Sequence, residues 1–167
     1  MDSICITFYS KTGVTRDLIN ALSKVLIERG YVVSMHRITA LKEYSRPLHL
    51  NPRLWRDALS NAEIPIEVVP PIDESKCDVI IIAAPIWIGR IAPPARSFIM
   101  KLRGFRGKVV LIVTSRFGRY CSKASKELES IGLKATCFDV IDRYVLRDAR
   151  VIALRIAKLL LNKFSSG

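Results

Sequence analysis

The sequence predicts one α/β domain, built as a parallel five-stranded sheet with helices on both faces. Strand-like and helix-like segments alternate along the whole chain. Residues 78–84 read DVIIIAA, a β-branched run typical of a parallel strand buried on both faces. The length of 167 residues suits a single domain, and half of the residues are hydrophobic, so a full core can form without disulfides or metals.

The first part of the chain predicts a strand, a helix and a second strand. Residues 3–9 (SICITFY) are apolar and rich in β-forming residues, which predicts a buried strand. Residues 15–29 carry leucine, isoleucine and valine at helical spacing, and Gly30 ends this helix. Residues 31–37 predict a second, weaker strand.

A long connection, residues 41–75, separates these elements from the central strand. Asn51 and the proline after it are typical of a helix N-cap and first turn, so we expect a short helix over residues 52–61. Prolines break the remainder. Beyond the central strand, we expect strands at 108–114 and 135–140 and helices at 94–102, 120–131 and 147–164.

The cysteines do not predict a metal site. The chain has four, Cys5, Cys77, Cys121 and Cys137, with neither a CxxC pair nor a Cys/His cluster, which argues against structural zinc. Three of them stand in apolar runs. We therefore expect these cysteines to be small buried hydrophobic side chains.

The charge is strongly basic, with a net value of +12. Such a surface favours an acidic protein partner, a nucleic acid or an anionic surface. The cations are scattered over the helices and no RNA- or DNA-binding motif accompanies them, so nucleic acid is disfavoured. The chain has no Gln and only four Asn, which favours a thermophilic source. No basic leader or bilayer-length apolar run is present, so we expect a cytoplasmic protein without a transmembrane segment.

Three loops follow predicted strands, where open parallel sheets bind ligands. Residues 10–16 (SKTGVTR) combine hydroxyl groups with Gly13 at a helix start, an arrangement that favours an anion. An N-capped helix without a ligand is the alternative. The loop is not a P-loop, because no Gly-Lys-Ser/Thr follows at the required spacing.

The other two loops carry aromatic residues. Residues 85–94 (PIWIGRIAPP) place Trp87 beside a glycine and an arginine, which favours stacking on a planar ring; the alternative folds Trp87 over the end of the sheet. Residues 114–120 (TSRFGRY) add Phe117, a glycine and two cations, with a solvated βα turn as the alternative.

Two of these segments resemble known flavin loops. Residues 9–16 (YSKTGVTR) resemble the phosphate-binding loop of flavodoxins, and residues 84–99 (APIWIGRIAPPARSFI) resemble the second flavin loop of small flavodoxin-family proteins. Residues 54–61 (LWRDALSN) are similar to the connection in that group. The resemblance implies a flavodoxin-like three-layer α/β/α sandwich, strand order 2-1-3-4-5, and flavin mononucleotide (FMN) as cofactor.

The family's binding roles carry over position by position. The residues implied at the phosphate are Ser10, Lys11, Thr12, Gly13, Val14 and Thr15. Those implied at the isoalloxazine ring are Pro85, Ile86, Trp87, Gly89 and Arg90, with Thr114, Ser115, Arg116, Phe117 and Gly118 on its other side and at its pyrimidine edge. We expect Arg90, Arg116 and Arg119 near the ring edge. Two departures stand out: Val14 occupies a position where the family usually has Asn, and electron-carrier flavodoxins are usually acidic.

The resemblance implies electron transfer or an FMN-dependent oxidoreductase, in the latter case one of the NAD(P)H quinone type. No side chain is required as acid, base or nucleophile, because a flavin does its own redox chemistry. His36 and His49 lie away from the three loops and have structural or surface roles. The implied partner is an acidic redox protein or a small-molecule acceptor. The alternative is a flavin-free binding module with a basic surface.

Overall fold

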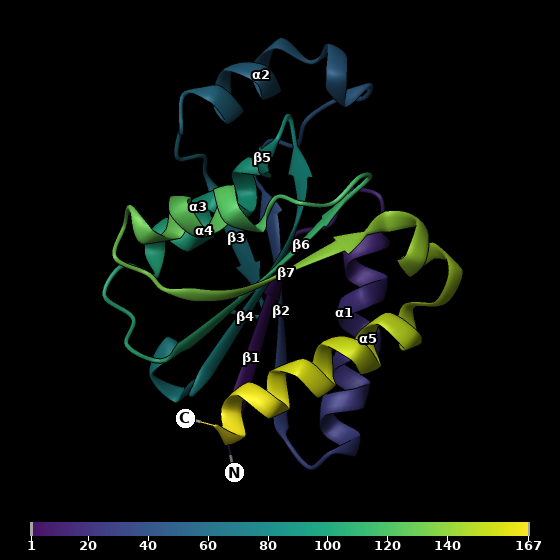
Figure 1. Cartoon of the computed structure of the whole chain (residues 1–167). Coiled ribbons are helices and arrows are strands. Elements are labelled where there is room, and N and C mark those ends of the chain that lie inside the picture. Colours follow the sequence, from purple (N-terminus) through teal and green to yellow (C-terminus); the bar gives the residue numbers. More distant parts are fainter. Residues whose placement is uncertain (1, 167) are drawn as a thin grey trace.

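The computed structural model describes residues 2–166. A sheet lies between two helical layers, with α1 and α5 on one face and α3 and α4 on the other (Figure 1). Its parallel strands are β1 (Ser3–Phe8), β2 (Val32–Ala40), β4 (Val79–Trp87), β6 (Lys108–Ser115) and β7 (Ala135–Ile141). The main helices are α1 (Val14–Glu28), α2 (Pro52–Leu59), α3 (Pro93–Lys101), α4 (Cys121–Glu129) and α5 (Asp142–Ser165). The parallel strands lie in the order β2-β1-β4-β6-β7.

The expectation of a five-stranded, wholly parallel sheet is wrong. Within residues 2–166 the sheet has seven strands, because β3 (Ile66–Val69) pairs antiparallel with β2 at the edge and β5 (Arg90–Ile91) pairs antiparallel with β4. Because residues 41–75 contain several prolines, the sequence predicts no strand in this connection. These prolines flank β3 instead of interrupting it, and an edge strand needs hydrogen bonds on one side only.

The sheet separates the two larger core clusters of residues 2–166, and a third, smaller one lies under the long connection. Leu18 and Leu22 of α1 pack with Ile156 of α5 against one face, while Phe98 of α3 and Leu128 of α4 pack against the other. The central residues of β4 are fully buried, as expected for a strand covered on both sides.

The last helix begins earlier than predicted. α5 starts at Asp142, and its helical geometry is interrupted at Asp148 (φ −160°, ψ 94°). The Val151 N–H donates to the Asp148 carboxylate at 3.2 Å, which is the contact of an N-cap. The predicted helix 147–164 therefore corresponds to the second piece of α5. No helix within residues 2–166 combines the length and the apolar character that crossing a bilayer requires.

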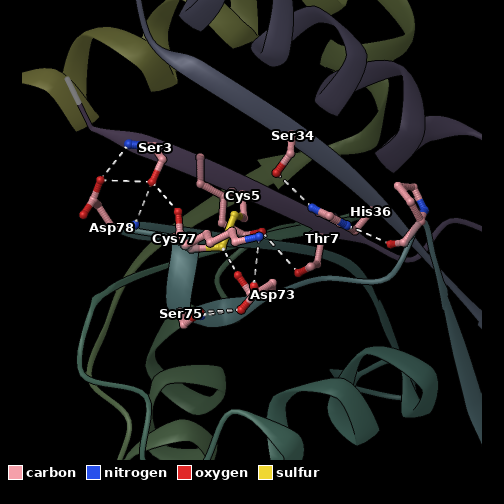
Figure 2. Close-up of a disulfide and its surroundings, with 12 residues drawn as sticks. Ser3, Cys5, Thr7, Ser34, His36, Asp73, Ser75, Cys77 and Asp78 are labelled. Atoms are coloured by element: carbon pink, nitrogen blue, oxygen red, sulfur yellow. Dashed lines mark hydrogen bonds and ion pairs between the residues drawn. A yellow bond between two sulfur atoms is a disulfide. The ribbon is translucent and has the colours of Figure 1, made fainter.

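All four cysteines form disulfides, Cys5–Cys77 and Cys121–Cys137, with Cα–Cα distances of 5.7 and 5.6 Å. The expectation of unpaired buried side chains is therefore wrong, although Cys5 and Cys77 are indeed buried. Figure 2 shows the first bond joining β1 to the segment just before β4, next to the hydrogen bonds between Ser3 and Asp78. The partners are 72 residues apart in sequence, so local pattern carries no sign of their pairing.

His36 has a structural role. Its Nδ1 lies 2.8 Å from the Pro70 carbonyl and its Nε2 lies 2.9 Å from the Ser34 hydroxyl (Figure 2). The ring thus ties β2 to the end of β3. Among the described residues, no group of three or more His, Cys, Asp or Glu is placed to hold a metal ion.

Candidate functional site

A cavity of about 200 Å³ lies at the carboxyl edge of the sheet. It is situated where the strand order reverses, between β1 and β4. Residues from all three loops singled out in the sequence line it, together with one residue from the start of α5. The lining residues are Ser10, Lys11, Thr12, Val14, Thr15, Pro85, Ile86, Trp87, Thr114, Ser115, Arg116 and Asp142.

The loop after β1 presents free amide groups at the start of α1. Gly13 adopts a left-handed conformation (φ 97°), and its N–H donates to the Ser10 hydroxyl at 3.1 Å. Gly13 has no side chain with which to cap the helix. Within residues 2–166, the N–H groups of Val14 and Thr15 have no protein acceptor. Such amides, reinforced by the helix dipole, favour an anion.

The loop after β6 repeats this local arrangement. The Gly118 N–H donates to the Ser115 hydroxyl at 2.8 Å, and Gly118 is also left-handed (φ 77°). The buried hydroxyls of Thr15 and Thr114 lie 2.7 Å apart and form a hydrogen bond between the two loops. The first and third loops are therefore held in a fixed relation.

Trp87 stands at the end of β4 and is held by two tyrosine rings. Its ring centroid lies 5.4 Å from that of Tyr9 and 6.0 Å from that of Tyr44, both in edge-to-face geometry. The Tyr9 hydroxyl donates to Glu43 and the Tyr44 hydroxyl donates to Asp57. Burial raises the pKa of both tyrosines, so both hydroxyls stay protonated.

The long connection therefore takes part in the site, because it supplies Tyr44 and the two carboxylates. α2, which belongs to this connection, lies above the carboxyl edge of the sheet (Figure 1). Its Asp57 is buried and also contacts Arg53 and Arg56. Sequence reasoning left this segment without a definite role, since nothing local indicates that it packs on Trp87.

Some predicted site residues do not line the cavity. Residues 86–91 form a tight β-hairpin with Ile88 and Gly89 at its turn, both with positive φ. The chain reverses at this turn, and Arg90 donates a hydrogen bond to the Asn61 side chain instead of lining the cavity. Phe117 is 78% exposed beside the cavity. Gly13 and Gly118 shape their loops without lining the space. Of the three arginines expected near a ring edge, Arg116 alone lines the cavity among the described residues.

Asp142 was missed by sequence reasoning. It is the first residue of α5 and follows β7 directly. Burial raises the pKa of its carboxyl group, and the Arg116 guanidinium opposes that shift. Its position in the sequence could have indicated it, because Asp142 comes two residues after the strand predicted at 135–140 and therefore at the same edge of the sheet.

Comparisons with solved structures identify the architecture. A flavoprotein from Lactobacillus acidophilus, solved in complex with FMN, matches with a TM-score of 0.68 at 17% identity, over 84% of this chain and 93% of that chain. A flavodoxin from the domain Archaea matches with 0.52 at 8%, over 93% and 96%. The two-electron reduced flavodoxin of Megasphaera elsdenii matches with 0.52 at 17%, over 83% and 85%.

The sequence comparisons give no match: neither a protein-family model nor a curated protein corresponds to this chain. The structural neighbours are flavodoxin-like flavoproteins, and at these low identities the likeness concerns the architecture. The chain has the flavodoxin-like α/β fold.

Proposed function

We propose that this protein binds FMN and transfers electrons through it. The observation that carries the proposal is one cavity in which the unpaired amides after β1, the hydroxyls after β6 and the Trp87 ring come together. Those three groups match the phosphate, polar chain and flat ring of FMN. The FMN-bound Lactobacillus acidophilus flavoprotein, which has this fold, supports the same ligand.

The residues present fit FMN, but one side-chain hydrogen bond to the phosphate is missing. The amides of Val14 and Thr15 and the hydroxyls of Ser10 and Thr12 would hold the phosphate, whereas the Val14 side chain offers no hydrogen bond. Trp87 would stack against the ring. FMN, when bound, supplies the redox chemistry, and the protein supplies position and charge.

The cavity size bears on how FMN would bind. Its volume of about 200 Å³ is below the roughly 300–1,000 Å³ of pockets that enclose a ligand of this class. Part of the flavin would therefore remain outside the protein. An exposed ring edge is what a partner needs in order to exchange electrons with it.

The visible spectrum tests the proposal. Purified protein incubated with FMN and then desalted should keep a flavin absorption band, and the flavin fluorescence should be quenched during titration. A colourless protein that leaves flavin fluorescence unchanged would contradict the proposal. That result would favour the alternative, a flavin-free binding module on this fold.

Within the flavin class, we propose an electron-transfer protein or an NAD(P)H-dependent, quinone-type oxidoreductase. A carrier needs only the exposed ring, whereas an enzyme also needs a place for the hydride donor and the acceptor. Steady-state NAD(P)H oxidation with a quinone acceptor separates them. Turnover that requires FMN supports the enzyme, and its absence in an FMN-loaded protein supports the carrier.

For the partner, we propose an acidic redox protein, with a small-molecule acceptor as the other possibility. The net charge of +12 would attract an acidic partner and raise its association rate at low salt. Reduction of the FMN-loaded protein by an acidic ferredoxin, followed by stopped-flow absorbance, should slow by tenfold or more between about 20 and 300 mM salt. A rate that does not change with salt would contradict this steering.

We also propose a cytoplasmic location in a thermophilic organism. Disulfides are rare in the cytosol of most organisms, yet intracellular proteins of hyperthermophiles are rich in them. Two disulfides, no Gln and four Asn are compatible with such a source. A midpoint of thermal unfolding below about 65 °C, the range of mesophilic domains, would argue against it.

Asp142 should weaken FMN binding, because its carboxylate faces the cavity that would receive an anion. We expect Asp142→Asn to bind FMN several-fold more tightly at pH 8. Protonation neutralises Asp142 at low pH, so the advantage of the variant should shrink as the pH falls through the raised pKa of this carboxyl group. Fluorescence titrations of both proteins over a pH series falling from pH 8 measure the ratio of the two affinities. The titration of FMN itself affects both proteins equally and cancels in this ratio. A ratio that stays constant over the whole series would refute this role.

A further inference from the structure

A second, larger cavity of about 480 Å³ lies between α3 and α4, next to β5. It shares no lining residue with the cavity at the three loops. β4 borders the first cavity and β5 borders the second, so the hairpin stands between them. The volume falls within the roughly 300–1,000 Å³ of small-molecule pockets.

The charges in this second cavity are unbalanced. Four cationic residues line it, Arg90, Arg96, Lys123 and Lys126, against one carboxylate, Glu127. Among the described residues, none of the ion pairs involves any of these side chains. Lys123 reaches toward the hairpin, since its Nζ would lie 3.8 Å from a Cβ placed on Gly89. Four cations against one carboxylate leave an excess of positive charge, which favours an anion.

The wall also contains unpaired polar atoms. Arg96 is 6% exposed and donates through Nη1 and Nη2 to the carbonyls of Ala58 and Asp57, yet its Nε has no partner. Glu127 Oε2 likewise has none. These are the only two such buried side-chain atoms within residues 2–166, and both belong to residues that line this cavity.

Burial shifts the pKa values of Arg96 and Glu127. It lowers the pKa of Arg96 and raises the pKa of Glu127, because each charge has lost water without gaining a full partner. The remaining wall is apolar and consists of Ile91, Ile99, Met100, Leu128 and Ile131, with Asn61 and Ser130.

We propose that this cavity binds a small organic anion that joins a phosphate or carboxylate group to an apolar ring and carries an O–H or N–H donor. The anionic group matches the four cations, the ring matches the aliphatic wall, and the donor matches Glu127. This site is independent of the flavin proposal, because it uses none of the same residues.

The probe is 1-anilinonaphthalene-8-sulfonate (ANS), which has an anionic group, an aromatic body and an N–H donor. ANS should bind the full chain with one-to-one stoichiometry and a rise in its fluorescence. Lys123→Ser/Lys126→Ser should weaken this binding about tenfold. The matched control is Lys24→Ser/Lys158→Ser, which removes the same charge from exposed positions on α1 and α5 and should leave binding unchanged.

Glu127→Gln is expected to have the opposite effect on ANS affinity. It removes the one negative charge and keeps an acceptor oxygen, so ANS should bind several-fold more tightly. Unchanged binding in Lys123→Ser/Lys126→Ser, or no tightening in Glu127→Gln, would overturn the proposal.

Competition identifies the natural class of anion. AMP offers a phosphate ester and salicylate offers an aromatic carboxylate. Displacement of ANS by AMP assigns phosphate esters, and displacement by salicylate assigns carboxylates. If neither displaces ANS at millimolar concentration, the proposed ligand chemistry is wrong.

Discussion

Replacing Cys5 and Cys77 together by alanine is expected to lower the free energy of unfolding by about 4 kcal/mol. The bond closes a loop of 72 residues and joins β1 to the entry of β4, two neighbouring central strands. In the chain-entropy description, a disulfide stabilises mainly by restricting the unfolded chain, and more so for a longer loop. Guanidinium unfolding followed by circular dichroism measures the difference.

The second disulfide provides a matched comparison. Cys121 and Cys137 are 16 residues apart, so the same double replacement should cost about 3 kcal/mol. Unfolding the unaltered protein with dithiothreitol present should reproduce the summed loss of both variants. If the reductant leaves the unfolding curve of the unaltered protein where it was, the cysteines are not paired. Such a result would also remove one support for the proposal of a thermophilic source.

Trp87→Ala is expected to weaken FMN binding by at least tenfold. The substitution removes the aromatic wall of the cavity, and ring stacking contributes about 0.5–1.5 kcal/mol beyond the area that it buries. It also leaves the Tyr9 and Tyr44 rings without the ring that they pack against. Titration of the protein with FMN, read by flavin fluorescence, gives the affinity.

The chain contains its own control for this substitution. Trp55, the other of its two tryptophans, lies on α2 with 43% exposure and donates to the His49 carbonyl, away from the cavity. Trp55→Ala should therefore keep the affinity for FMN. Trp87→Phe, which retains an aromatic face, should lose less than Trp87→Ala. Equal losses at the two tryptophans would show that Trp87 does not stack on the ligand.

The strands of the parallel sheet could be predicted from the local sequence pattern. β4 reads as a buried strand because its β-branched run leaves no exposed face, and Gly30 marks the end of α1 without tertiary information. The loop after β1 was readable for the same reason. Its glycine and hydroxyl residues describe a turn whose geometry depends on neighbours three residues apart.

The antiparallel strands were not readable in that way. β3 is only four residues long and flanked by prolines, so its pairing with β2 depends on the fold around it. The direction of Arg90 depends on the two-residue turn at Ile88 and Gly89. Isoleucine seldom adopts a positive φ, and for this reason the sequence did not indicate a tight hairpin there.

The sequence by itself determined the layered α/β architecture and the three loops at one edge of the sheet. Both follow from hydrophobic period and from the rule that parallel strands end on the same side. The tertiary structure alone decided which cysteines pair and that Tyr44 and α2 pack onto Trp87. It also decided that Asp142 lines the cavity at the three loops and that Arg90 lines a different cavity. Each of these contacts joins residues distant in sequence or sets the direction of a side chain, and burial against distant partners determines them.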